Sequence, residues 1–333
     1  MTKRPNLPFK SVTTLQKDFS ELPFGYDDFL YRPKHYGIKG IITNDDLDGI
    51  TSALMYSDWS GLPIVGIFDY KTLWYDPRHT DISPLDCVWL DTDSCDPKIR
   101  CIGNHTTMLS NRDFTSINSI NMNDWYDIHG QKFGIYNHHY TGSTALMIHA
   151  FGMSKVKDDI GRRLVLLADS TWNNKVKAGQ NGYETFIDDW LQRMNLESLV
   201  PLIPTNEHGD EYQAFIDLKR QIGLGFNVQY DGTIKSGIKL DVISNILGVA
   251  KPDIFDQTLI RRESFKGKTK LDLNVVKNAS GTPLTKRDLE RHLKQYGGMS
   301  EDSRIFNVSF TATNRINVNW RENCVGVGAV YGL

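Results

Sequence analysis

The stretch from Gly40 to Met55, GIITNDDLDGITSALM, constrains this chain more than any other part of its sequence. Its apolar start stops abruptly at three carboxylates, Asp45, Asp46 and Asp48. A glycine and a segment with helical spacing, residues 50–59, follow, so the pattern predicts a buried strand, a tight turn and a helix. Three carboxylates beside a buried strand repel one another unless a cation compensates them, and hard divalent ions take oxygen ligands. The simpler alternative is a solvated acidic turn in which an Asp caps the helix.

The same arrangement occurs a second time along the chain. Residues 87–90 (CVWL) form an apolar run that ends in Asp91, Thr92 and Asp93. Residues 64–68 (IVGIF) are apolar or glycine at every position, which is typical of a buried parallel strand. Because sites in open α/β sheets form at the carboxyl ends of strands, two acidic strand ends are better evidence for a site than one. The alternative role for Asp91 is to cap the exit of its strand.

Composition sets the class of protein. The chain has 333 residues, enough for about two domains, and 40% of them are hydrophobic, which suits a globular protein with sizeable cores. No apolar run approaches the roughly 20 residues of a membrane span, and the N-terminal residues lack the apolar segment of a secretory signal. The four cysteines have neither metal-finger spacing nor a disulfide pattern. We therefore expect a cytoplasmic protein with no membrane partner.

Further periodic segments predict an α/β fold with a mainly parallel sheet and a smaller α+β C-terminal domain. We expect a loop at 70–84, a Gly-rich hairpin or linker at 224–239, and helices at 160–168, 183–199, 210–222 and 241–247. The C-terminal part predicts a strand at 271–276, a helix at 284–295 and strands at 305–311, 314–320 and 325–331. The predicted domains are an N-terminal arm (1–36), a metal-binding catalytic domain (37–200), a helical linker (201–250) and a substrate-binding domain (251–333).

Charge is distributed unevenly between these parts. Residues 251–333 carry 14 Lys and Arg against 9 Asp and Glu, although the whole chain has a net charge of −2. A basic C-terminal part beside an acidic remainder suits a polyanion in one place and metal ions in the other. Chance variation over a segment of this length is the alternative explanation.

Histidines and a further acid follow the acidic strand ends. One histidine, His105, follows a short apolar piece and Asn104, and a pair, His138 and His139, follows a strand-like run. The pair is either loop filler or, given the carboxylates upstream, a ligand for metal or phosphate. Asp169 follows the predicted helix at 160–168, where it is either a plain terminal residue or a fourth metal carboxylate.

The ordered set of motifs resembles that of the DHH phosphoesterase family, which includes RecJ-type single-strand exonucleases, nano-RNases, cyclic-dinucleotide phosphodiesterases and manganese pyrophosphatases. The first family motif often reads His-Asn-Asp-x-Asp-Gly, and residues 44–49 (NDDLDG) match it. The resemblance therefore implies metal binding by Asp46 and Asp48. Asp91 matches the second motif, whose Asp bridges two metals, and Asp169 matches the fourth. The resemblance covers residues 37–172.

This chain departs from the family pattern at several positions. Asn44 stands where the first motif has a histidine, which changes one ligand position, and we assign Asn44 to substrate binding. Either His105 or the pair His138 and His139 represents the third motif, and the sequence leaves both alternatives open. Family members often carry a Gly-Gly-Gly-His substrate motif near the C-terminus, but residues 296–299 (YGGM) have the glycines without the histidine. We interpret these glycines as the end of a helix.

The resemblance implies an enzyme, a hydrolase that cleaves phosphodiester bonds with two divalent ions, Mn²⁺ or Mg²⁺. The expected substrate is single-stranded DNA or RNA or a short oligonucleotide, cleaved by an exonuclease. The alternatives are a phosphodiesterase for cyclic dinucleotides or other small molecules, and a binding protein that has lost catalysis. The expected metal ligands are Asp46, Asp48, Asp91, Asp169 and His105, and the histidine that does not bind metal (His105, His138 or His139) is expected at the scissile phosphate. The expected substrate-backbone contacts are Arg261, Arg262, Lys266, Lys268 and Lys270. The sequence does not indicate an oligomeric state.

Overall fold

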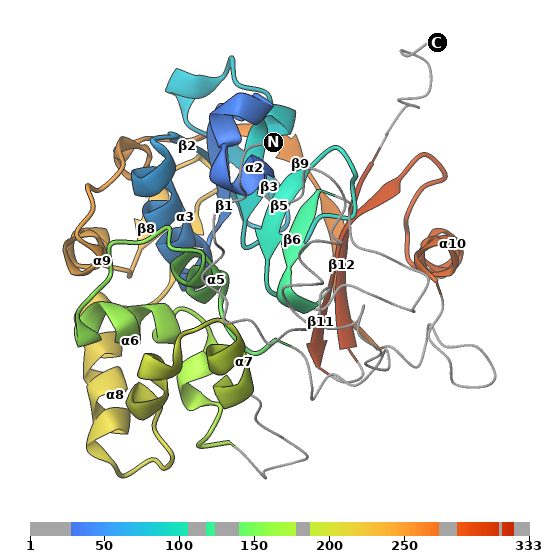
Figure 1. The fold of residues 1–333 in the computed structure, drawn as a ribbon. Helices are drawn as coiled ribbons and strands as arrows, with labels where there is room; N and C mark the ends of the chain where they lie inside the picture. The colour runs from blue at the N-terminus through green and yellow to red at the C-terminus, as the bar shows by residue number, and fades with distance from the viewer. Residues whose placement is uncertain are drawn as a thin grey trace, which may run out of the picture.

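The computed structural model describes residues 28–105, 118–123, 140–177, 187–272, 285–312 and 315–322, and its centre is a seven-stranded sheet (Figure 1). The strand order is β6-β5-β4-β1-β2-β3-β9. The strands are β1 (Gly40–Asn44), β2 (Ile64–Phe68), β3 (Thr72–Tyr75), β4 (Cys87–Leu90), β5 (Arg100–Gly103), β6 (Ser119–Asn121) and β9 (Ile260–Ser264). The first five in the order are mutually parallel, and β3 runs antiparallel to β2 and β9.

The parallel strands form because their residues are apolar on both faces. Ile41 belongs to the core on one face of the sheet, whereas its neighbour Ile42 belongs to the core on the other, as the period of two in a strand requires. The described helices are α2 (Asp28–Tyr31), α3 (Leu47–Ser60), α5 (Thr144–Ala150), α6 (Asp159–Leu167), α7 (Ile187–Arg193), α8 (Asp210–Ile222), α9 (Leu240–Leu247) and α10 (Lys286–Tyr296). Residues of α3, α5, α6, α8 and α9 share the core of Ile41, and Figure 1 shows these helices gathered on one side of the sheet.

A second, antiparallel sheet covers the other face. It has the order β10-β12-β11, with β10 at Lys266–Asp272, β11 at Arg304–Ala312 and β12 at Arg315–Arg321. Its Phe306 packs with Phe68 and Trp89 of the first sheet at ring-centroid distances of 5.6 and 5.3 Å. The predicted α/β class with a smaller C-terminal sheet is thus confirmed.

Several expected boundaries differ from the structure. The loop expected at 70–84 contains β3, and the strand expected at 271–276 begins earlier, as β10 at Lys266. The helix expected at 183–199 is interrupted: within the described residues it consists of α7, which ends at Arg193, and a separate 3-10 helix at Glu197–Leu202. The Gly-rich segment contains a hairpin of β7 (Phe226–Val228) and β8 (Ile234–Ser236), one of the two expected forms.

Other expectations agree with the structure or lie outside its described part. Gly297 caps the C-terminus of α10, as the sequence indicated. Most of the N-terminal arm and the last expected strand, 325–331, lie outside the described residues. Within the described residues, no helix is long and apolar enough to cross a membrane.

Candidate active site at the carboxyl ends of β1 and β4

The strand order reverses at β1. From β1 the chain passes to β2 on one side, and it later returns to place β4 on the other side and continues outward to β5 and β6. In open α/β sheets, ligands bind outside the carboxyl ends of the strands at such a switch point. The two acidic segments of the sequence follow these two strands, so the topology brings them to one place.

The turn after β1 is tight, and Gly49 makes it possible. Asp46 caps the N-terminus of α3, where its Oδ1 accepts a hydrogen bond from the amide of Gly49 at 2.9 Å. A Cβ atom on Gly49 would lie 2.7 Å from the Cβ and 2.8 Å from the main-chain oxygen of Asn44. Glycine is therefore required for the helix to start so close to the end of the strand. Asp46 thus both caps α3 and belongs to the acidic group, so the two alternatives suggested by the sequence are compatible.

Asp48 is buried and connects α3 with α5. Its carboxylate accepts hydrogen bonds from the main-chain amides of Thr144 at 2.7 Å and Ala145 at 2.8 Å, at the N-terminus of α5. Burial, followed by the charges of Asp46 and Asp169, raises the pKa of Asp48 to about 7 although the two amides act in the opposite direction. The second lone pair of its Oδ2 is left for another partner.

Asp91 lies between these groups, with a side chain only 1% exposed. Its carboxylate accepts hydrogen bonds from the hydroxyl of Thr144 at 3.1 Å and from the side-chain amide of Asn44 at 3.3 Å. Its backbone is left-handed, with φ 55°, a conformation that Asp and Asn tolerate better than most residues. Burial and the charges of Asp46 and Asp48 raise the pKa of Asp91 well above its ordinary value.

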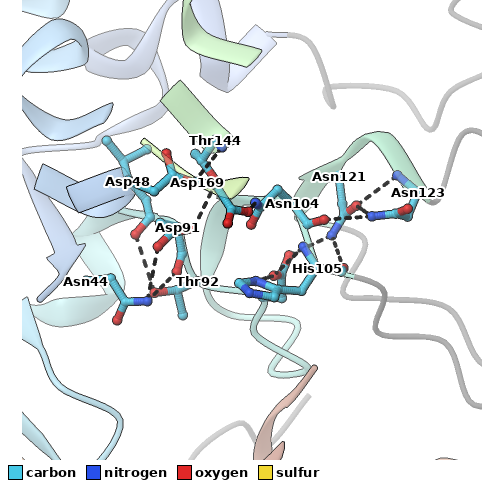
Figure 2. A network of polar contacts seen from close by, with 12 residues as sticks. Asn44, Asp48, Asp91, Thr92, Asn104, His105, Asn121, Asn123, Thr144 and Asp169 are labelled. Atoms are coloured by element: carbon cyan, nitrogen blue, oxygen red, sulfur yellow. Dashed lines mark hydrogen bonds and ion pairs between the residues drawn. The ribbon is translucent and has the colours of Figure 1, made fainter. Parts of the chain in front are cut away.

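Asp169 completes a group of four carboxylates. It follows α6 and is exposed, and its Oδ2 accepts a hydrogen bond from the side-chain amide of Asn104 at 3.1 Å. Figure 2 shows Asp48, Asp91, Asp169 and Thr144 close together. The structure therefore brings together the four acids that the sequence singled out: Asp48 and Asp91 are buried, whereas Asp46 and Asp169 are exposed.

His105 faces this group and is fixed by Asp93. Asp93 is buried, and its Oδ2 lies 3.1 Å from both the main-chain nitrogen and the Nδ1 of His105. Asn121 donates to the other oxygen of Asp93 at 2.6 Å and to the main-chain oxygen of His105 at 2.7 Å. Burial disfavours the charged imidazolium, but Asp93 together with the charges of Asp169 and Asp46 raises the pKa of His105 to about 9. At neutral pH, His105 is a cation beside the carboxylates.

Sequence reasoning missed two side chains at this site. Asp93 was visible as an acid at the end of β4, but its partner His105 comes from another strand. Tyr70 lies two residues beyond β2, and its hydroxyl accepts a hydrogen bond from Asn44 at 2.6 Å. Its place after the carboxyl end of a parallel strand is the signal that would have identified it.

The basic residues expected to contact substrate lie elsewhere. Arg261 and Arg262 are on β9, which β2 and β3 separate from β1. The guanidinium carbon of Arg261 lies 5.6 Å from the ring centroid of Trp74, and that of Arg262 lies 5.6 Å from the ring centroid of Tyr75. Lys266 begins β10 and pairs with Glu322 at 3.8 Å. The structure does not bring these three residues to the carboxylates. The pair His138 and His139 lies outside the described residues, as do the side chains of Lys268 and Lys270.

The donor chemistry of the carboxylate group suits a divalent cation. Burial and the charges of neighbouring acids raise the pKa values of Asp46, Asp48 and Asp91. All four carboxylates offer hard oxygen ligands, the type that Mg²⁺ and Mn²⁺ prefer. In addition, the Oδ1 of Asn104 is buried and has no hydrogen-bond partner within the described structure. In the side-chain positions of this structure, however, no three described His, Cys, Asp or Glu residues form a finished ligand set. A cation at this group would therefore require other side-chain positions than those of this structure.

Comparison of the chain with models of known protein families, with curated proteins and with solved structures finds no match, so the site must be interpreted from its own geometry.

Proposed function

We propose that this protein is a metal-dependent hydrolase of phosphodiester bonds that acts on single-stranded nucleic acid or short oligonucleotides, most simply as an exonuclease. The observation that carries the proposal is the meeting of four carboxylates from three chain segments at the switch point of the sheet. Burying like charges is costly unless a cation joins them, and the raised pKa values of Asp48 and Asp91 express that cost. The resemblance of the motifs to those of DHH phosphoesterases supports the same reaction.

The residues of the site have distinct roles in this proposal. Asp46, Asp91 and Asp169 would hold Mn²⁺ or Mg²⁺, with Asp91 central and Asp48 adding its Oδ2. One or two such ions would supply a water of lowered pKa and stabilise charge on the phosphate oxygens. His105, held by Asp93 through Nδ1, is protonated at neutral pH and presents a hydrogen-bond donor to the phosphate or to the leaving oxygen.

A binding protein without hydrolytic activity is the second candidate, and two hydrogen bonds favour it. The amides of Asn44 and Asn104 donate to Asp91 and Asp169, and so satisfy carboxylate lone pairs that a cation would otherwise take. The resemblance places a histidine at the position of Asn44. The two candidates differ in turnover, and the same assay separates them.

The test compares two variants, one at each end of β4. Asp91→Asn removes a carboxylate at the carboxyl end of β4, whereas Asp86→Asn, the control, removes one just before the amino end, where Asp86 pairs with exposed Lys39. An end-labelled single-stranded oligonucleotide is incubated with Mn²⁺, and Mn²⁺ binding is followed by electron paramagnetic resonance. The proposal expects cleavage by wild type and by Asp86→Asn, and its loss with EDTA and in Asp91→Asn.

Other outcomes redirect or reject the proposal. Mn²⁺ binding without cleavage of the oligonucleotide leads to an assay with cyclic dinucleotides, and a negative result there supports the binding protein. If wild type binds no Mn²⁺, the metal site is wrong.

A further inference from the structure

Tyr70 is held in place from two sides. Its backbone is left-handed, with φ 64°, and its main-chain oxygen accepts a hydrogen bond at 2.9 Å from the side-chain amide of Asn319, which lies on β12 of the second sheet. Its ring packs against Phe68 at 5.4 Å. Phe68 in turn contacts Phe265 and Phe306, which belong to the core between the two sheets. The second sheet therefore helps to set the position of Tyr70.

The orientation of the Asn44 amide determines what the Tyr70 hydroxyl does. The Nδ2 atom of Asn44 lies 2.8 Å from the main-chain oxygen of Asp91, and a carbonyl oxygen can only accept. The NH₂ group must therefore be on this side, because the opposite orientation would place two acceptors against each other. The same Nδ2 lies 2.6 Å from the Tyr70 hydroxyl, which consequently accepts a hydrogen bond.

The hydroxyl proton of Tyr70 is then left to point elsewhere. Within the described part of the chain, the structure shows no acceptor for it. The hydroxyl is nevertheless close to the carboxylates, because the Nδ2 atom that it contacts lies 3.3 Å from Oδ2 of Asp91. Burial and then the charges of Asp91 and Asp46 raise the pKa of Tyr70 well above its ordinary value. The phenol thus remains a neutral donor at neutral pH, at the edge of an acidic site and with no acceptor for its proton among the described residues.

We propose that the Tyr70 hydroxyl is a substrate-binding group, which donates its proton in a hydrogen bond to a non-bridging oxygen of the substrate phosphate. This inference rests on the proposed function, because it takes the ligand of the site to be a phosphodiester. A neutral donor adds a hydrogen bond to an anion without adding charge, and it leaves the carboxylates to a cation. Tyr70, from the end of β2, and His105, from the end of β5, would then contact the phosphate from opposite sides of β1 and β4.

The link to the second sheet extends the inference. Asn319 contacts the main-chain oxygen of Tyr70, so in this inference it is a positioning residue. Removal of its amide by Asn319→Ala is expected to weaken substrate binding in the same direction as removal of the hydroxyl, but by less.

The experiment removes one hydroxyl at a time. Tyr70→Phe keeps the ring in its aromatic cluster, and the control Tyr75→Phe removes a buried hydroxyl on β3 that contacts the thiol of Cys87. The probe is hexathymidylate, end-labelled with fluorescein. We measure KM and kcat for its cleavage with Mn²⁺, and its dissociation constant by fluorescence anisotropy in Ca²⁺. The affinity of each variant for Mn²⁺ is measured separately. Thermal melting shows whether each variant is folded.

The expected result for Tyr70→Phe is a roughly tenfold rise in KM and in the dissociation constant of the probe, as one hydrogen bond to a charged group predicts. Mn²⁺ affinity should stay within twofold of wild type, and Tyr75→Phe should change neither quantity. A loss of Mn²⁺ affinity in Tyr70→Phe that equals the loss of probe affinity would overturn the inference, because Tyr70 would then act only through Asp91.

The remaining outcomes separate this inference from the proposed function. If wild type cleaves the probe and Tyr70→Phe behaves like Tyr75→Phe, the role of Tyr70 is wrong and hydrolysis stands. If wild type binds the probe without cleaving it and Tyr70→Phe binds it more weakly, hydrolysis is wrong and the role of Tyr70 stands. If wild type neither binds nor cleaves the probe, both are wrong.

Discussion

The side-chain amide of Asn44 donates a hydrogen bond to the main-chain oxygen of Asp91 at 2.8 Å. This contact joins the ends of β1 and β4 at a residue whose backbone is left-handed, with φ 55°. A histidine at position 44, which the resemblance to DHH phosphoesterases would place there, has a different shape and different hydrogen-bonding geometry. In this chain Asn44 therefore stabilises the position of Asp91, the central acid of the site.

Replacement of Asn44 by Ala should destabilise the protein. The buried carbonyl of Asp91 loses a donor, so we expect the free energy of unfolding to fall by about 1–3 kcal/mol. Urea denaturation measures the change, with Asn245→Ala, an exposed position on α9, as the control. A decrease of less than about 0.5 kcal/mol, the range of ordinary surface substitutions, would show that Asn44 does not stabilise the folded protein through this hydrogen bond.

The stability of the metal-free protein should fall as the pH rises from 5 to 8. Burial, with repulsion from neighbouring acids, raises the pKa of both Asp45 and Asp48 to about 7, above the ordinary value of 3.8 in the unfolded chain. Between these values the folded state binds more protons than the unfolded state, so unfolding becomes easier as the pH rises. His105 acts in the same direction between its ordinary value of 6.5 and about 9.

Thermal melting in EDTA at pH 5.0 and pH 7.5 measures this dependence. We expect a higher melting temperature at pH 5.0, a smaller difference in Asp48→Asn, and a smaller difference when Mn²⁺ is added, because a bound cation favours the ionised acids. A higher melting temperature at pH 7.5 in EDTA would contradict the raised pKa values.

The sequence predicted the centre of the fold because its signals there are local. Buried parallel strands have continuous apolar runs, so the limits of β2 and β4 agree with those expected. The strand β9 was missed for a different reason. β9 has an exposed, charged sequence, IRRES, and it is a strand only because it pairs with β3 at the edge of the sheet. Such long-range pairing leaves no local pattern to detect.

The site was predictable to the same extent. The acids Asp46, Asp48 and Asp91 stand next to apolar runs, and the chain itself places them at strand ends. Asp93 and Tyr70 also follow strand ends, but their hydrogen-bond partners, His105 and Asn44, come from other strands, so the sequence could not assign their roles. The charged groups of the site could therefore be predicted from the sequence, whereas the hydrogen bonds between them could be identified only from the tertiary structure.

The pKa of His105 should depend on Asp93. Asp93 accepts the Nδ1 hydrogen bond and contributes charge, so Asp93→Asn leaves burial as the larger influence and should lower the pKa of His105 from about 9 to 6.5 or below. Nuclear magnetic resonance of ¹³C-labelled histidine follows the titration. His149, whose pKa burial lowers to about 4, serves as an internal control that should not change. A His105 pKa that stays near 9 in the variant would assign the shift to other groups.

The arginines of β9 should matter for long substrates only. Arg261 and Arg262 are exposed on a strand that two others separate from β1, so a nucleic acid must extend beyond the carboxylates to reach them. In the double variant Arg261→Gln and Arg262→Gln, we expect a higher KM for an oligonucleotide of about 20 nucleotides and no change for a dinucleotide. The slope of log affinity against log salt concentration should decrease by about 1.4, because each phosphate contact on a single strand contributes about 0.7. Lys239→Gln, an exposed charge at the start of α9, is the control. An equal effect on the dinucleotide would mean that the arginines reach the scissile phosphate itself, in conflict with the order of the strands.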